Sequence, residues 1–241
     1  MARRIKKKDL KKPDEFITLS GKIVTWCRDN KRFGMGVATG VVFLLLFVGG
    51  FFLFKAHREA KARVLYQAAL TLYPDDTSAQ ASAAEYAAAA SKLEELRERY
   101  GSTSVAIRGL VDLGNAYFQG GDYDKAISSY QDFLQRADSR HPLRDQVLES
   151  LGTTYEAKGS WDDALGAYEQ LAREGAPAYQ QQAELYLGRV YEALGDRETA
   201  MNHYQAYLEG NPRTGIAEWI RTKVAQWQLA ESSEEKDEGA K

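Results

Sequence analysis

The sequence predicts an all-α protein in which one N-terminal transmembrane helix is followed by a solenoid of helix pairs. Two observations predict this fold. Residues 34–54 carry no charged side chain, and a helix of that length spans the hydrocarbon core of a bilayer, which is about 30 Å thick. Further along the chain, one pattern of glycine, alanine and tyrosine recurs in three copies, as it does in proteins built from helical repeats.

The charge of the chain is divided between its two ends. The formal net charge of the 241 residues is −2, but residues 1–33 hold eleven Lys and Arg against four Asp and Glu, a net charge of +7. Residues 55–241 hold 21 basic and 30 acidic side chains, a net charge of −9. Because Lys and Arg are retained in the cytoplasm, we expect a single-pass protein of the bacterial inner membrane, with a cytoplasmic N-terminus and a periplasmic C-terminal domain.

The apolar run at 34–54 ends without the small-residue cleavage site of a signal peptide. We therefore expect a retained transmembrane anchor, and the alternative is a buried core helix. Within the run, Gly36 and Gly40 form one G-x-x-x-G spacing, which lets two membrane helices approach closely. This spacing is either a contact in a homo-oligomer or a chance match.

The basic segment before the span is expected in two parts, a disordered tail over residues 1–12 and a cytoplasmic amphipathic helix over residues 13–33. Basic side chains lie on one side of this helix, and apolar side chains recur at helical spacing on the other. The apolar positions are Phe16, Leu19, Ile23 and Trp26. Such a helix is typical of the interface of an anionic lipid bilayer, and the alternative is a docking surface for a membrane partner.

The repeated pattern consists of a glycine followed by tyrosine, glycine, alanine and tyrosine at 3, 7, 12 and 16 positions. The copies are 38 and then 36 residues apart. We expect the first glycine to allow close helix contact, the second to serve a turn, the alanine to keep the paired helix close, and the tyrosines to fill the space between helices. The structural positions are Gly114, Tyr117, Ala126, Tyr130, Gly152, Tyr155, Ala164, Tyr168, Gly188, Tyr191, Ala200 and Tyr204, with turns at Gly121, Gly159 and Gly195.

This pattern resembles the tetratricopeptide repeat, L-G-x-x-Y followed by A-x-x-x-Y/F on a second helix. The resemblance implies that the N-terminal transmembrane helix is followed by a tetratricopeptide-repeat α-solenoid, with three repeats over residues 107–213. Residues 55–106 are expected to form either a degenerate first repeat or adaptor helices. Residues 214–230, with apolar positions at Ile216, Trp219, Ile220, Val224 and Trp227, are expected to form a capping helix, and residues 231–241 an acidic tail.

The resemblance also implies a protein-binding groove along the first helix of each repeat. The candidate groove residues are Arg108, Val111, Asn115, Phe118, Gln146, Glu149, Thr153, Glu156, Gln182, Leu185, Arg189 and Glu192. For each of them the alternative is a solvated helix face. A carboxylate clamp of the kind found in some repeat proteins is not expected, because Val111 stands where the clamp needs Lys and Ser150 stands where it needs a second Asn.

No motif for catalysis, phosphate binding or metal binding is present. A single cysteine, Cys27, excludes an internal disulfide framework, and the three histidines are not at ligand spacing. The negative charge of residues 55–241 argues against nucleic acid as a partner. We therefore expect no enzyme activity, no cofactor and no metal, with other proteins and the lipid bilayer as partners.

The order of basic segment, span and repeat domain is similar to that of the ancillary SecYEG translocon subunit family. The resemblance implies a periplasmic, chaperone-like scaffold that assists translocation, folding or assembly of envelope proteins. The alternative is an accessory or structural subunit of a membrane complex, in cell division, outer-membrane assembly, respiration or transport, that handles no clients.

Overall fold

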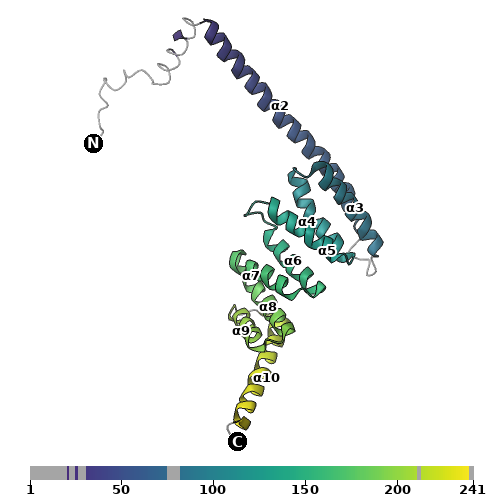
Figure 1. Cartoon of the computed structure of the whole chain (residues 1–241), viewed down its shortest axis with the longest axis vertical. Coiled ribbons are helices and arrows are strands. Elements are labelled where there is room, and N and C mark those ends of the chain that lie inside the picture. Colours follow the sequence, from purple (N-terminus) through teal and green to yellow (C-terminus); the bar gives the residue numbers. More distant parts are fainter. Residues whose placement is uncertain (1–20, 22–24, 27–30, 75–81, 211–212, 239–241) are drawn as a thin grey trace, which may run out of the picture. The chain divides into compact units, whose positions relative to one another are not determined.

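The computed structural model describes residues 21, 25–26, 31–74, 82–210 and 213–238, which form helices and no strand (Figure 1). The backbone divides into two units, Met1–His57 and Arg58–Lys241. The helices are α2 (Lys31–Leu70), α3 (Ala83–Tyr100), α4 (Ser104–Gln119), α5 (Tyr123–Arg136), α6 (Arg144–Lys158), α7 (Trp161–Glu174), α8 (Pro177–Leu194), α9 (Arg197–Glu209) and α10 (Gly215–Glu238).

The first unit contains the apolar part of helix α2. Its large side chains are exposed on all sides of the helix, with Phe43 67%, Leu46 66% and Phe47 74% exposed, a distribution that suits lipid and not water. The helix reaches a mean hydropathy of 2.5 over 18 residues. The hydroxyl of Thr39 donates to the carbonyl of Met35 at 2.8 Å, so this polar group has its partner within the helix. Helix α2 is thus long and apolar enough to cross a membrane.

Helix α2 does not end with the apolar run. The sequence predicts a span over 34–54 that is followed either by a degenerate repeat or by an adaptor that continues the membrane helix, and α2 continues without a break to Leu70. The reason is local, because residues 55–63 consist of Lys, Ala, His, Arg and Glu, most of which are strong helix formers, and include no glycine or proline.

In the second unit the helices pack in chain order, each against the next, from α3 to α10 (Figure 1). The pairs α4–α5, α6–α7 and α8–α9 are the three repeats; α4 also contacts α6, and α6 contacts α8. The solenoid of helix pairs is therefore confirmed.

Each pair is held together at a glycine. A Cβ atom on Gly152 would lie 2.4 Å from Cε1 of Tyr168, so only glycine allows the tyrosine ring to reach the backbone of the first helix. The same contact joins Gly114 to Tyr130 and Gly188 to Tyr204. All three tyrosines are at most 1% exposed, and the alanines at 126, 164 and 200 are completely buried. These glycines and tyrosines therefore make the close contact between the two helices of each pair.

The turns between the two helices of each pair also match the prediction. Gly121, Gly159 and Gly195 have φ angles of +79°, +78° and +83°, in the left-handed region that side chains with a Cβ rarely adopt. The second helix then begins at once, and in two of the pairs Asp122 and Asp196 cap it by accepting from a backbone N–H three residues later.

The segment predicted as a degenerate repeat or adaptor packs against the first repeat. Tyr66 on α2 is buried and donates to Asp112 Oδ2 on α4 at 2.6 Å. Glu59 on α2 accepts from the backbone N–H groups of Ser104 and Val105, at 3.2 and 3.1 Å. It therefore satisfies backbone donors at the start of α4 that have no partner within that helix.

The last helix differs from its prediction in two respects. Ile220 and Val224 are buried as expected, in one cluster with Tyr204 of α9, but Ile216 and Trp219 are 53% and 54% exposed. The backbone of α10 also remains helical to Glu238, into the segment assigned to the acidic tail, where glutamates and a lysine favour helix.

Candidate functional site

The site lies on the face formed by the first helices α4, α6 and α8, which we call the inner face. Two sets of side chains join neighbouring helices across this face, and we call them the α6–α8 clasp (Glu156, Tyr168, Arg189) and the α8–α10 clasp (Glu192, Tyr204, Lys223). In each clasp a glutamate accepts a hydrogen bond from a tyrosine hydroxyl of its own repeat and pairs with a cation, which is on α8 in the first clasp and on α10 in the second.

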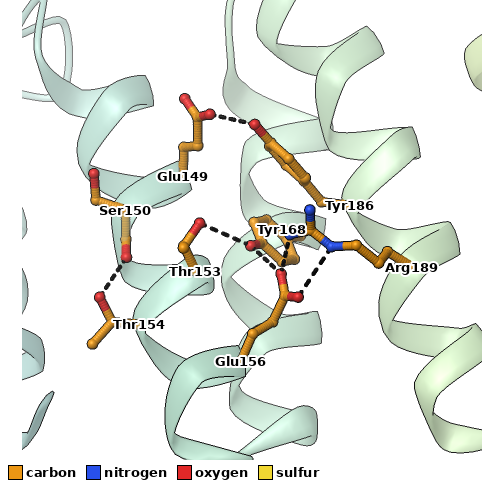
Figure 2. A network of polar contacts seen from close by, with 8 residues as sticks. All are labelled: Glu149, Ser150, Thr153, Thr154, Glu156, Tyr168, Tyr186 and Arg189. Atoms are coloured by element: carbon orange, nitrogen blue, oxygen red, sulfur yellow. Dashed lines mark hydrogen bonds and ion pairs between the residues drawn. The ribbon is translucent and has the colours of Figure 1, made fainter. Parts of the chain in front are cut away.

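The α6–α8 clasp is a bidentate ion pair (Figure 2). Arg189 donates from Nη2 to Glu156 Oε1 at 2.6 Å and from Nε to Glu156 Oε2 at 3.1 Å. Tyr168 donates to the same carboxylate at 2.5 Å. Burial lowers the pKa of the Arg189 guanidinium, but the contact with Glu156 outweighs it and leaves the pKa above its usual value. A fork-shaped contact of this kind fixes the two helices in one relative position.

The α8–α10 clasp repeats this arrangement with lysine. Lys223 donates to Glu192 Oε1, and Tyr204 donates to Glu192 Oε2 at 2.7 Å. Burial raises the pKa of Glu192, but the two donors together bring it below the usual value. The Lys223 ammonium also lies 4.0 Å from the centre of the Trp219 ring, at a distance where cation–π attraction is strong.

Between α4 and α6 the corresponding clasp is missing. Both clasp glutamates lie four residues after the repeat glycine, and in the first repeat this place is held by Phe118. Arg189 lies one residue after the repeat glycine, and in the second repeat this place is held by Thr153. No ion pair joins α4 to α6 among the described residues. Tyr130 donates instead to Asn115 Oδ1 at 2.6 Å.

A cavity of about 320 Å³ opens where the clasp is missing, and we call it the α4–α6 cavity. It is lined by Asn115, Phe118, Gln119, Tyr130, Gln146, Glu149, Ser150 and Thr153. Its volume is at the lower end of the range of ligand pockets, about 300–1,000 Å³, and its lining offers three side-chain amides, two aliphatic hydroxyls and one carboxylate to a ligand.

The carboxylate of the cavity is held by a neighbouring repeat. Tyr186 of α8 donates its hydroxyl to Glu149 (Figure 2), and burial, with the nearby Glu149, raises the pKa of Tyr186 to about 12. Tyr186 therefore keeps its proton at neutral pH and remains a donor. Its ring stacks on the ring of Tyr168 with centroids 4.8 Å apart. The donor that positions Glu149 is therefore itself held by packing against the tyrosine of the α6–α8 clasp.

Ten of the twelve predicted groove residues fall into three groups. Asn115, Phe118, Gln146, Glu149 and Thr153 line the α4–α6 cavity, and Glu156, Arg189 and Glu192 belong to the clasps. Arg108 is exposed on α4, 6.0 Å from the ring of Tyr66, and Gln182 is half-buried on α8.

Two of the predicted groove residues were placed wrongly. Val111 and Leu185 are 4% and 7% exposed, so they cannot line an open groove. Val111 belongs to the same buried cluster as Val147 and Leu151 of α6, and Leu185 lies in the buried cluster that includes Ile220 of α10. Neighbouring helices cover both positions.

The clasps themselves were missed by sequence reasoning. A signal for them exists, because a glutamate four residues after the repeat glycine recurs in the second and third repeats and is absent from the first. Gln119 and Ser150 of the cavity were also not among the groove candidates.

Of the predicted membrane-interface residues, Phe16, Leu19 and Ile23 lie outside the described residues, and Trp26 is 49% exposed. A Cβ atom on Gly36 or Gly40 would meet no other atom within 4 Å. Among the described residues, no group of three or more His, Cys, Asp or Glu side chains could hold a metal ion.

The sequence profile of a family described as "Tetratricopeptide repeat-like domain" matches residues 30–229. Among curated proteins, the "Intraflagellar transport protein 88 homolog" of Homo sapiens is 29% identical over 99 residues, which are 41% of this chain. The chain spans only 12% of the length of that protein.

A solved structure shows the same fold. A tetratricopeptide repeat protein from Parabacteroides merdae matches with a TM-score of 0.51 and 21% identity, over 61% of this chain and 55% of that one. PilF of Pseudomonas aeruginosa also matches, with a TM-score of 0.46 and 18% identity, over 78% of this chain and 85% of that one.

Proposed function

We propose, since this chain belongs to the tetratricopeptide repeat-like domain family, that it is a membrane-anchored scaffold that binds another protein in the α4–α6 cavity. The observation that carries this proposal is the missing clasp. Along the inner face, glutamate and cation pairs occupy the other two helix junctions, whereas at α4–α6 the polar side chains of the cavity are open to a partner.

The proposed anchor is the apolar part of α2. Its exposed apolar side chains support a place in lipid, and the +7 charge of residues 1–33 supports a cytoplasmic N-terminus with the repeats in the periplasm. The basic segment before the span would then lie on anionic lipid, and Gly36 and Gly40 are the positions where two spans could meet.

For the biological role we propose assistance to the translocation, folding or assembly of envelope proteins. The support is the resemblance in element order to the ancillary SecYEG translocon subunit family. The alternative is a subunit of a membrane complex that handles no clients, in which α2 and the segment before it carry the main interaction.

The proposal is tested by rebuilding the missing clasp. A double variant, Phe118→Glu with Thr153→Arg, puts the glutamate and cation of the α6–α8 clasp into the α4–α6 cavity. The matched control, Ser128→Glu with Gln205→Arg, makes exposed changes of the same signs on the second helices α5 and α9. All three full-length proteins are purified in mild detergent, and the proteins that accompany them are identified by mass spectrometry.

We expect the double variant to fold, by circular dichroism, and to lose the partner that the wild type and the control retain. Translocon subunits and periplasmic chaperones among the lost proteins would support client handling, and a single division, assembly, respiratory or transport complex would support the alternative. Retention of every partner by the double variant would exclude the cavity as the binding place.

A further inference from the structure

We propose that the α4–α6 cavity receives a basic side chain, lysine or arginine, from an extended segment of the partner protein. This inference rests on the proposed function of the cavity and names the chemistry of its ligand. The carboxylate of Glu149 would bind the cation, the ring of Phe118 would pack on its alkyl stem, and the side-chain amides of the cavity would hydrogen-bond to the backbone of the segment.

The charge of Glu149 favours a basic ligand. The carboxylates of the two clasps each bind a cation: Glu156 binds Arg189 of α8, and Glu192 binds Lys223 of α10. Glu149 receives the hydroxyl of Tyr186, and no lysine or arginine forms an ion pair with it among the described residues. A half-buried carboxylate that lacks a cation attracts one more strongly than a fully solvated carboxylate does.

An aromatic ring next to Glu149 also favours a long basic side chain. Phe118 packs against Tyr123 of α5, with centroids 5.7 Å apart, and it lines the cavity together with Glu149. A carboxylate next to an aromatic ring suits the long side chains of lysine and arginine, whose stems are apolar and whose ends are charged.

The clasps contain the same chemistry within this molecule. Arg189 binds Glu156 while its guanidinium lies 5.1 Å from the centre of the Tyr186 ring. Lys223 binds Glu192 while it lies 4.0 Å from the Trp219 ring. A basic side chain of the partner would therefore give the α4–α6 junction the set of carboxylate, aromatic ring and cation that the other two junctions form internally.

An acidic ligand side chain is disfavoured on the same observations. Within the described part of the chain, no lysine or arginine lines the cavity, and residues 55–241 carry a net charge of −9. A carboxylate would meet Glu149 without a compensating cation, and like charges at close range repel.

The test uses the full chain in mild detergent and a matched set of short fluorescent peptides with blocked ends, in which the residues around the central position are uncharged. Each peptide carries one central residue, which is arginine, its neutral isostere citrulline, or glutamate. Binding is measured by fluorescence anisotropy for the wild type, for Glu149→Gln, and for Glu169→Gln, which removes an equal charge from an exposed position on α7. Gln at position 149 can still accept the Tyr186 hydroxyl, so the fold is expected to survive.

We expect the wild type to bind the arginine peptide about tenfold more tightly than the citrulline peptide, the size of a charge-assisted hydrogen bond. This preference should disappear in Glu149→Gln, remain in Glu169→Gln, and weaken as ionic strength rises. Equal binding of the arginine and citrulline peptides, absence of binding, or a preference that survives Glu149→Gln would overturn the inference.

These outcomes are separate from the test of the proposed function. If the rebuilt clasp removes the natural partner while arginine and citrulline peptides bind equally, the cavity is the binding place and its preference for a cation is wrong. If the rebuilt clasp leaves the partner bound, the proposed function itself fails.

Discussion

The repeat glycines set the distance between the two helices of each pair. In Gly152→Ala the new Cβ would lie 2.4 Å from Cε1 and 2.5 Å from Cζ of Tyr168, so the ring or the helix must move. Overpacking of this kind costs about 1–3 kcal/mol. We expect urea unfolding of the full chain in detergent to show a loss of that size.

The control for this variant is Gly166→Ala on α7. A Cβ there meets no other atom within 4 Å, and alanine in an exposed helix interior is about 1 kcal/mol more stable than glycine. The two variants should therefore shift the urea midpoint in opposite directions. A shift of both in the same direction would mean that the close contact with Tyr168 does not determine the effect.

The carboxylate of Glu192 makes the last clasp sensitive to acid. Because its pKa is lowered in the folded protein from 4.5, the clasp stabilises the fold above that pH, and the stabilisation is lost as the pH falls through the lowered pKa. Glu192→Gln should cost about 1 kcal/mol at neutral pH, and the difference from the wild type should shrink in acid. Thermal unfolding at several pH values measures this, with Glu209→Gln as an exposed control on α9. A difference that is constant with pH would contradict the assignment.

At the scale of the element, the end of α2 is attached to α4 through Tyr66. In Tyr66→Phe the Asp112 carboxylate loses the donor at 2.6 Å, and a buried acceptor without its donor costs about 1–3 kcal/mol. Hydrogen exchange of the full chain should become faster over residues 58–70. The matched control is Tyr86→Phe, because Tyr86 makes a ring contact with Tyr73 and its hydroxyl has no hydrogen bond among the described residues. Unchanged exchange over 58–70 in Tyr66→Phe would show that this hydrogen bond does not hold α2.

The helices and turns could be predicted from the sequence because their causes are local. The spacing of Gly152, Gly159, Ala164 and Tyr168 describes one pair of helices completely. The continuation of α2 past residue 54 could be predicted only as one of two alternatives, because the choice depends on how residues 58–70 pack against α4.

The candidate site was predicted only in part, because it depends on neighbouring repeats. Arg189 reaches a carboxylate 33 residues earlier in the chain, and the burial of Val111 depends on α6. Neither relation follows from the pattern of one repeat. The helix that carries each groove residue could be predicted. The two clasps and the α4–α6 cavity could not, because they form only when adjacent repeats pack together.

At the scale of the whole molecule, the charge distribution predicts the orientation in the membrane. A fusion of alkaline phosphatase to the C-terminus should be active, because this enzyme folds in an oxidising compartment and the orientation that we propose from the positive-inside rule has the repeats outside the cytoplasm. The chain should be released from membranes by detergent and not by high salt. An inactive fusion would contradict a periplasmic repeat domain.

The central claim is that the partner protein binds on the inner face where the clasp is missing. It is tested most directly by replacing Phe118 with a photoreactive benzophenone amino acid in the full chain in cells, with Ser128, exposed on the second helix α5, as the matched control position. The account predicts a crosslinked partner from position 118 and none from position 128. The same crosslink from both positions, or a crosslink from position 128 alone, would contradict it.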